Sequence, residues 1–159
     1  MRYLFFVSVF LLHLSGYGQK DMSVSDLNPY QDEVKQTILA FFESFHKGDT
    51  LNLKNTIGEN LILQTIVVNK EGKTVVMQTP KQNLFKAISS KPKDQQWNEK
   101  LMSFTINADA KIATAWTPYE FFVNDTFSHC GVNVFQLYKD ENQWRIIAIA
   151  DTRQKEGCQ

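Results

Sequence analysis

The second half of the sequence contains four long strand-like segments that follow one another with only short turns between them. These segments are residues 97–107, 110–123, 126–138 and 143–153. Turn residues separate them at Ala108-Asp109, Asn124-Asp125 and 139–142. Consecutive strands joined by tight turns form an antiparallel sheet, whereas a parallel sheet alternates strands with helices. The pattern therefore predicts a large antiparallel sheet with one apolar face that helices must cover.

A long amphipathic helix is expected before these strands. Asn28 can cap it and Pro29 suits its first position, while Gly48 ends it. Its apolar residues recur at three- and four-residue steps, and they are Val34, Ile38, Phe41, Phe42 and Phe45. Asp49 can then cap a short second helix.

The stretch between this helix pair and residue 97 predicts a hairpin and a third helix. Residues 60–68 and 73–79 are strand-like and flank a turn at 69–72. Thr79-Pro80 repeats the cap-then-proline start of a helix, which carries Leu84 and Ile88 on one side. The expected fold is α+β, a cone-shaped curved antiparallel sheet wrapped around the long N-terminal helix, as in a cystatin-like roll.

The first eighteen residues have the three parts of a secretory signal peptide: a basic residue, a short apolar run and small residues near Gly18. The apolar run is too short for a membrane-spanning helix. We therefore expect cleavage near Gly18 and export to the periplasm or the medium. Residues 19–28 are expected to form a flexible lead, and residues 29–159 one domain.

Charge and motifs exclude several classes of function. Lysine plus arginine and aspartate plus glutamate both number 17, and no run of like charge favours nucleic acid or an acidic membrane as a partner. The sequence has no phosphate loop, dinucleotide fingerprint, nucleophile elbow or metal-binding spacing. No cofactor and no metal are expected.

Strand alternation predicts which side chains face the covered side of the sheet. If Asn124-Asp125 is a two-residue turn, Phe122 pairs with Phe127 and Glu120 with His129. Continuing the register adds Pro118 opposite Gly131 and Trp116 opposite Asn133, all on one face. Phe135 and Leu137 extend that face and mark it as the inner one, with Tyr119, Cys130 and Tyr138 outside.

A histidine opposite a carboxylate on an aromatic-lined face is a candidate acid–base pair. Burial and coupling can move the pKa of His129 or Glu120 toward neutrality, where proton transfer works best. Contact with a ligand and a purely structural hydrogen bond are the alternatives. Asp151 and Arg153 fall on the outer face by plain alternation, and a β-bulge would reverse this.

Several pieces near the carboxyl end resemble the nuclear transport factor 2-like superfamily, and more narrowly the bacterial lumazine-binding protein group. These pieces are residues 116–121, 129–131, 144–146 and 149–153. Wider relatives include ketosteroid isomerase, scytalone dehydratase and SnoaL-type polyketide cyclases, alongside non-catalytic binding and dimerisation modules. The resemblance makes Asp151 and Arg153 site candidates, since they belong to the closing segment.

The resemblance also implies a ligand cavity and a homodimer. Together with the alternation it gives these candidate ligand-binding residues: Phe41, Phe45, Trp116, Phe122, Phe127, Asn133 and Arg153. Relatives commonly pair through the outer face of the sheet, where alternation puts Tyr119, Phe121, Val132, Val134 and Tyr138.

Export would expose Cys130 and Cys158 to oxidation, and the tail after Arg153 is long enough to fold back to Cys130. We expect a disulfide between them. A free buried Cys130 and an intermolecular bridge through Cys158 are the alternatives.

Three functions are compatible with these observations. The first is an exported module that binds a small apolar or planar molecule. The second is a cofactor-independent isomerase, dehydratase or cyclase that uses His129 with Glu120 or Asp151. The third is a dimerising scaffold without a working pocket.

Overall fold

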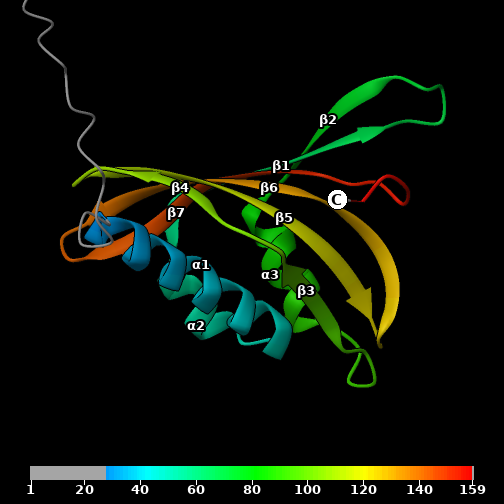
Figure 1. The fold of residues 1–159 in the computed structure, drawn as a ribbon. Coiled ribbons are helices and arrows are strands. Elements are labelled where there is room, and N and C mark those ends of the chain that lie inside the picture. Colours follow the sequence, from blue (N-terminus) through cyan, green and yellow to red (C-terminus); the bar gives the residue numbers. More distant parts are fainter. Residues whose placement is uncertain (1–27, 159) are drawn as a thin grey trace, which may run out of the picture.

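The computed structural model describes residues 28–158, which form a curved seven-stranded sheet with three helices on one face (Figure 1). The expected signal peptide and all but the last residue of the expected lead lie outside the described residues. The α+β architecture with a long N-terminal helix and a curved, mostly antiparallel sheet is as predicted.

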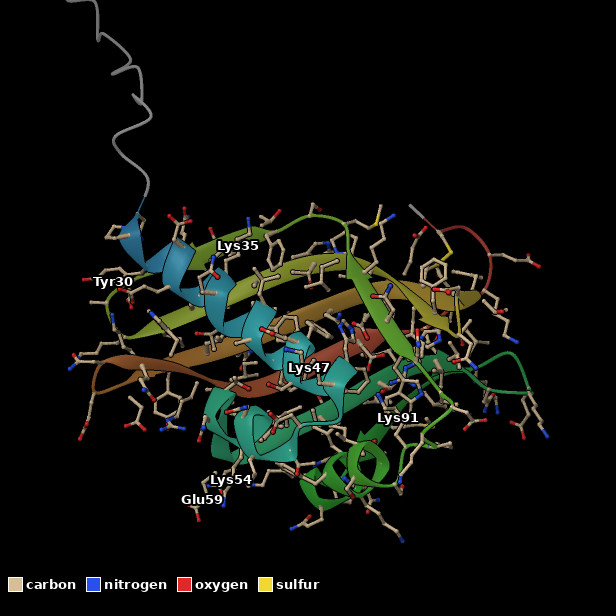
Figure 2. All side chains as sticks on the ribbon, turned by 90° about the horizontal axis from the view of Figure 1, so that it is seen from below. Tyr30, Lys35, Lys47, Lys54, Glu59 and Lys91 are labelled. Atoms are coloured by element: carbon tan, nitrogen blue, oxygen red, sulfur yellow. A yellow bond between two sulfur atoms is a disulfide. The ribbon has the colours of Figure 1, made fainter. Side chains whose placement is uncertain are left out.

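Helix α1, Pro29–Lys47, begins and ends where the sequence indicates. The Asn28 side chain accepts a hydrogen bond from the backbone N–H of Tyr30, and Pro29 supplies a fixed φ at the first position. Gly48 ends the helix in the left-handed region, with φ of 74°. Figure 2 shows α1, between the labelled Tyr30 and Lys47, crossing the concave face of the sheet.

Helices α2 and α3 are short and cover the same side of the sheet (Figure 1). Helix α2, Thr50–Thr56, is capped by the Asp49 carboxylate, which accepts from the N–H groups of Leu51 and Asn52. Helix α3 is Lys81–Ser89. The predicted cap at Thr79 is wrong, because Thr79 is the last residue of a strand and no side chain caps this helix.

The strands run in the order β2-β1-β7-β6-β5-β3, with β4 also paired to β5. Their bounds are β1 Ile57–Val68, β2 Thr74–Thr79, β3 Trp97–Leu101, β4 Thr105–Ala108, β5 Ile112–Val123, β6 Thr126–Asp140 and β7 Gln143–Thr152. One pair, β1 with β7, is parallel, and the other strand pairs are antiparallel as expected. The expected strand 97–107 is also two strands, interrupted at 102–104.

The core lies between α1 and the sheet. Side chains of α1 such as Val34 and Ile38 are fully buried against Phe135, Leu137 and Ile146 of the sheet. The inward direction of Phe135 and Leu137 is as predicted from alternation. The β1–β2 hairpin extends past the sheet, away from the helices (Figure 1). None of the helices within residues 28–158 has the length and apolar character that crossing a bilayer requires.

Candidate functional site

A β-bulge in strand β6 decides which side chains face the helices. The turn Asn124-Asp125 is as predicted, both residues having positive φ, and Phe122 pairs with Phe127. The register then shifts, so that Phe121 rather than Glu120 pairs with His129. Ser128 is the extra residue on β6. Beyond it, each β6 residue pairs with the β5 residue next to the expected one, so the β5 side chains on the inner face are those that simple alternation puts outside.

The resulting inner face lines a cavity of about 450 Å³ between the sheet, α1 and α3. One part of its lining is aromatic, with ring centroids of Phe45 and Trp97 5.3 Å apart and those of Phe45 and Phe121 6.4 Å apart. Phe41 and Phe42 of α1 and Leu84 of α3 also line the cavity. This wall suits the flat or apolar body of a small molecule.

Another part of the lining is polar and centres on Asp151. Its Oδ1 accepts a hydrogen bond from Thr65 Oγ1 at 2.6 Å, and its Oδ2 accepts one from Arg153 Nε at 2.7 Å. The Tyr119 hydroxyl donates to the Thr152 carbonyl at 2.9 Å and lies 3.4 Å from Asp151 Oδ2. Burial and the nearby carboxylates raise the pKa of Tyr119, which keeps the phenol protonated.

Glu99 of β3 is a second acid in the polar part. Its Oε1 accepts a hydrogen bond from Asn133 Nδ2 at 2.7 Å, and its backbone N–H donates to His46 Nε2 at 2.8 Å. Glu99 is half-buried and lines the cavity. Burial raises the pKa of Glu99 to about 7, although the hydrogen bond from Asn133 works in the other direction.

His129 lies beside this cluster, between two aromatic rings. Its ring centroid is 5.0 Å from that of Phe121 and 5.8 Å from that of Tyr119, and its Nδ1 is 3.1 Å from Ser128 Oγ. Burial lowers the pKa of His129, and the Arg153 guanidinium lowers it further. The imidazole is therefore mainly neutral at neutral pH and can exchange hydrogen bonds with a ligand.

The close approach of strand β7 to strand β6 at Gly131 holds the polar part together. A Cβ atom at position 131 would lie 1.8 Å from the Thr152 carbonyl oxygen, so only glycine fits there. Thr152 lies between Asp151 and Arg153. Glycine at 131 therefore lets the end of β7 carry both charged side chains to the cavity.

The structure brings six of the sequence-predicted site residues together around the cavity. They are Phe41, Phe45, His129, Asn133, Asp151 and Arg153. Asp151 and Arg153 line the cavity, whereas plain alternation puts them on the outer face, so that expected direction is wrong. A register shift between Gln136 and Leu137 in the β6–β7 pairing turns this end of β7 inward.

Four predicted site residues lie away from the cavity, and their predicted inward direction is wrong. Glu120 is on the outer face, where its carboxylate is 3.8 Å from Lys100 Nζ, and it pairs with Cys130 instead of His129. Trp116 is 52% exposed on the same outer face. Phe122 and Phe127 pack on each other at the hairpin tip, with centroids 5.9 Å apart. The bulge at Ser128 accounts for the position of Glu120 and Trp116.

Sequence reasoning missed Glu99, Tyr119 and Phe121, all of which line the cavity. Tyr119 and Phe121 were expected on the outer face and are inside because of the same bulge. The signal for Glu99 was present, because Trp97, Glu99 and Leu101 alternate along β3 and share its less exposed side. Within residues 28–158 no group of three or more histidine, cysteine or acidic side chains is arranged to hold a metal ion.

The predicted disulfide is present in the structure. Cys130 and Cys158 are bonded, with Cα atoms 5.8 Å apart. The tail returns to the outer side of β6 through an isolated bridge in which Cys130 and Gln154 exchange two backbone hydrogen bonds of 2.9 Å. The backbone bridge thus ties the residue after Arg153 to the residue after His129, and the disulfide fixes the tail beyond it to the same position.

Comparison with solved structures places the fold among nuclear transport factor 2-like, or cystatin-like, proteins. A nuclear transport factor 2-like protein from Cytophaga hutchinsonii is 15% identical, with a TM-score of 0.62 over 80% of this chain and 100% of that one. A protein of unknown function with a cystatin-like fold from Nostoc punctiforme is 14% identical, with a TM-score of 0.60 over 79% and 92%. A nuclear transport factor 2-like protein with a cystatin-like fold from Novosphingobium aromaticivorans is 17% identical, with a TM-score of 0.58 over 80% of this chain and 82% of that one.

No family model and no curated protein matches the sequence. At these identities the structural likeness shows the fold alone. The function therefore has to be inferred from the residues of the site.

Proposed function

We propose that this protein binds a small molecule with a flat or apolar body in the cavity between α1, α3 and the sheet. The observation that carries the proposal is the two-part lining: an aromatic wall formed by Phe45, Trp97 and Phe121 adjoins a polar part that contains Glu99 and Asp151. Ligand pockets typically combine an apolar wall with a few convergent polar groups, and about 450 Å³ lies within their usual size range.

We further propose that the protein works after export. The signal-like pattern of residues 1–18 supports this, and the Cys130–Cys158 bond supports an oxidising compartment. Sequencing the amino terminus of the processed protein tests it, since cleavage near Gly18 is the expected result. Membership of the lumazine-binding protein group is supported by the carboxyl-terminal sequence pieces and belongs to the same proposal.

The binding proposal can be tested by filling the cavity. Ala87 lies on α3, is exposed and lines the cavity, so Ala87→Trp places an indole in the ligand space without removing core packing. Gln82→Trp, on the same helix and outside the lining, is the matched control. Binding of 2-naphthol, measured by calorimetry, should weaken at least about tenfold in the first variant only.

Native mass spectrometry of protein purified from its own host provides an independent test, because a retained molecule would give its mass directly. Absence of a retained molecule together with no 2-naphthol binding by the unmodified protein would exclude the proposed function.

A second candidate function, proton-transfer catalysis, is favoured by one observation. Glu99 has a pKa of about 7 and faces the cavity, as a general acid or base requires. Glu120 drops out of this mechanism because it lies outside, whereas His129 and Asp151 remain in the cavity. The test is exchange of the α-hydrogens of 2-tetralone with deuterated water, followed by NMR, with Glu99→Gln as the variant expected to lose any exchange.

A further inference from the structure

The cavity contains one acid that has no cationic partner. Asp151 and Arg153 are paired with each other, with Nε and Oδ2 2.7 Å apart. Glu99 takes part in no ion pair within residues 28–158. A buried acid of this kind is costly when ionised, because its charge has lost water; the Arg153 guanidinium only partly offsets this effect of burial on the Glu99 pKa.

One oxygen of Glu99 is directed to the ligand space. Oε1 is used by Asn133. Among the described residues, no side-chain nitrogen or oxygen is both buried and without a hydrogen-bond partner. Oε2 has no partner in that part of the chain, so it is accessible, and Glu99 is part of the cavity lining.

The aromatic wall beside Glu99 is also suited to a positive charge. The three ring centroids of Phe45, Trp97 and Phe121 lie within 6.5 Å of one another. Aromatic faces attract cations through the ring quadrupole. One ammonium group already uses this wall, because Lys91 Nζ is 5.5 Å from the Trp97 ring centroid (Lys91 is labelled in Figure 2). Lys91 itself is not part of the cavity lining.

We infer that the ligand is an organic cation, an alkyl- or arylammonium ion whose positive group lies between the aromatic wall and Oε2 of Glu99. The inference rests on the proposed binding function and adds the charge of the ligand to it. An anionic ligand would meet Glu99 and Asp151, and Arg153, the one arginine among the described residues that line the cavity, already donates from its Nε to Asp151. A neutral ligand would leave Glu99 without the ion pair that a cation can form with its carboxylate.

Proton release on binding is a specific consequence. The groups around Glu99 are Asp151 of β7, Arg153 just after β7, His129 of β6, Tyr119 of β5 and His46 of α1. Burial lowers the pKa of both histidines and raises that of Tyr119, so Glu99, with a pKa of about 7, is the group that changes protonation near neutral pH. A bound cation stabilises its carboxylate, so cation binding should release a proton and strengthen as pH rises through about 7.

The test uses two probes of the same shape on the processed, disulfide-bonded protein. Phenyltrimethylammonium carries a charge that does not depend on pH, and tert-butylbenzene is its neutral isostere. By calorimetry at pH 8 the cation should bind at least about tenfold more tightly. Titration at pH 7 in two buffers of different ionisation enthalpy should show proton release with the cation alone.

Variants connect the effect to Glu99. Glu99→Gln should remove most of the preference for the cation and the proton release. Glu120→Gln removes the same charge from the neighbouring strand on the outer face and should keep both.

Each other outcome has a defined meaning. Equal or tighter binding of tert-butylbenzene overturns the inference and leaves the proposed function standing. A preference for the cation that survives in Glu99→Gln overturns Glu99 as its partner. Failure of both probes and of 2-naphthol to bind overturns the inference and the proposed function together.

Discussion

The side-chain amide of Asn133 on β6 donates a 2.7 Å hydrogen bond to the carboxyl group of Glu99 on β3, although β5 lies between these two strands in the sheet. The contact forms across the concave surface, where the curvature of the sheet brings inward-facing side chains together. It leaves Glu99 facing the cavity with one free oxygen, in an environment that favours the protonated acid.

The first prediction concerns the effect of Glu99 on stability at different pH values. Its pKa is raised from the ordinary 4.5 to about 7, so the folded protein binds this proton more tightly than the unfolded chain does. The stabilisation is complete below about pH 4.5 and is lost as pH rises through 7. The wild type should lose at most about 3 kcal/mol from this group between pH 5 and pH 8. Glu99→Gln should lack this loss, as measured by urea unfolding at both pH values.

Glu120→Gln is the control for this measurement and should show the wild-type pH dependence. Equal losses in the wild type and in Glu99→Gln would show that Glu99 is not the acid responsible.

The second prediction is that His129→Ala weakens binding without unfolding the protein. The imidazole lines the cavity and packs against Phe121 and Tyr119, and it makes no backbone hydrogen bond in the described chain. Loss of one polar contact of about 1 kcal/mol should weaken 2-naphthol binding roughly fivefold. Gln136→Ala, on an exposed position of the same strand, should bind normally. A His129→Ala protein that melts several degrees lower and binds normally would make His129 structural.

The third prediction concerns the disulfide. The bond closes a loop with a sequence separation of 28, and the chain-entropy model gives a loss of about 3 kcal/mol without it. Cys158→Ser is the suitable variant because Cys158 is exposed, whereas Cys130 is buried. Urea unfolding should show the loss, and the intact mass of the non-reduced wild type should be two hydrogens below that of the reduced chain. Two alkylatable thiols in freshly exported protein would contradict the prediction.

The fourth prediction is a homodimer formed through the outer face of the sheet. Helices cover only the other face (Figure 1), and Trp116 and Ile112 are 52% and 55% exposed on the open face. Val132, Val134 and Tyr138 lie on this face as expected, whereas Tyr119 and Phe121 do not, because they line the cavity. Trp116→Glu should shift the protein from dimer to monomer in sedimentation at micromolar concentration.

Leu51→Glu is the matched control for the dimer, since Leu51 is the most exposed of the large apolar side chains in the described chain and lies on α2. It should leave the dimer intact. A wild type that sediments only as a monomer would contradict the prediction.

Helices and strands could be predicted from this sequence because their signals are local. The spacing of Val34, Ile38 and Phe41, the cap at Asn28 and the glycine at 48 together define α1, and the structure agrees at both ends. The parallel pairing of β1 with β7 could not be predicted, because the two strands are far apart in sequence and no turn connects them.

The site was harder to predict, because one extra residue in a strand changes which of its side chains face the cavity. One extra residue at Ser128 exchanges Glu120 and Trp116 for Tyr119 and Phe121 inside the cavity. The register shift in the β6–β7 pairing similarly brings Asp151 inside. Neither irregularity is marked by a distinctive residue type in the sequence. A bulge is stabilised by tertiary packing, which cannot be read from the spacing of residues along the chain.

The bulge at Ser128 also divides the β5–β6 hairpin into a tip, where sequence length can change during evolution, and a part that lines the cavity. We expect one-residue insertions and deletions between Ser128 and the turn to be tolerated, because gain or loss of the bulge can restore the pairing register before Tyr119 and Asn133. Homologous chains can therefore vary the length and chemistry of the hairpin tip while keeping the same residues around the ligand. Alignments of such chains should place gaps around 124–128 and align the cavity residues on both sides of them.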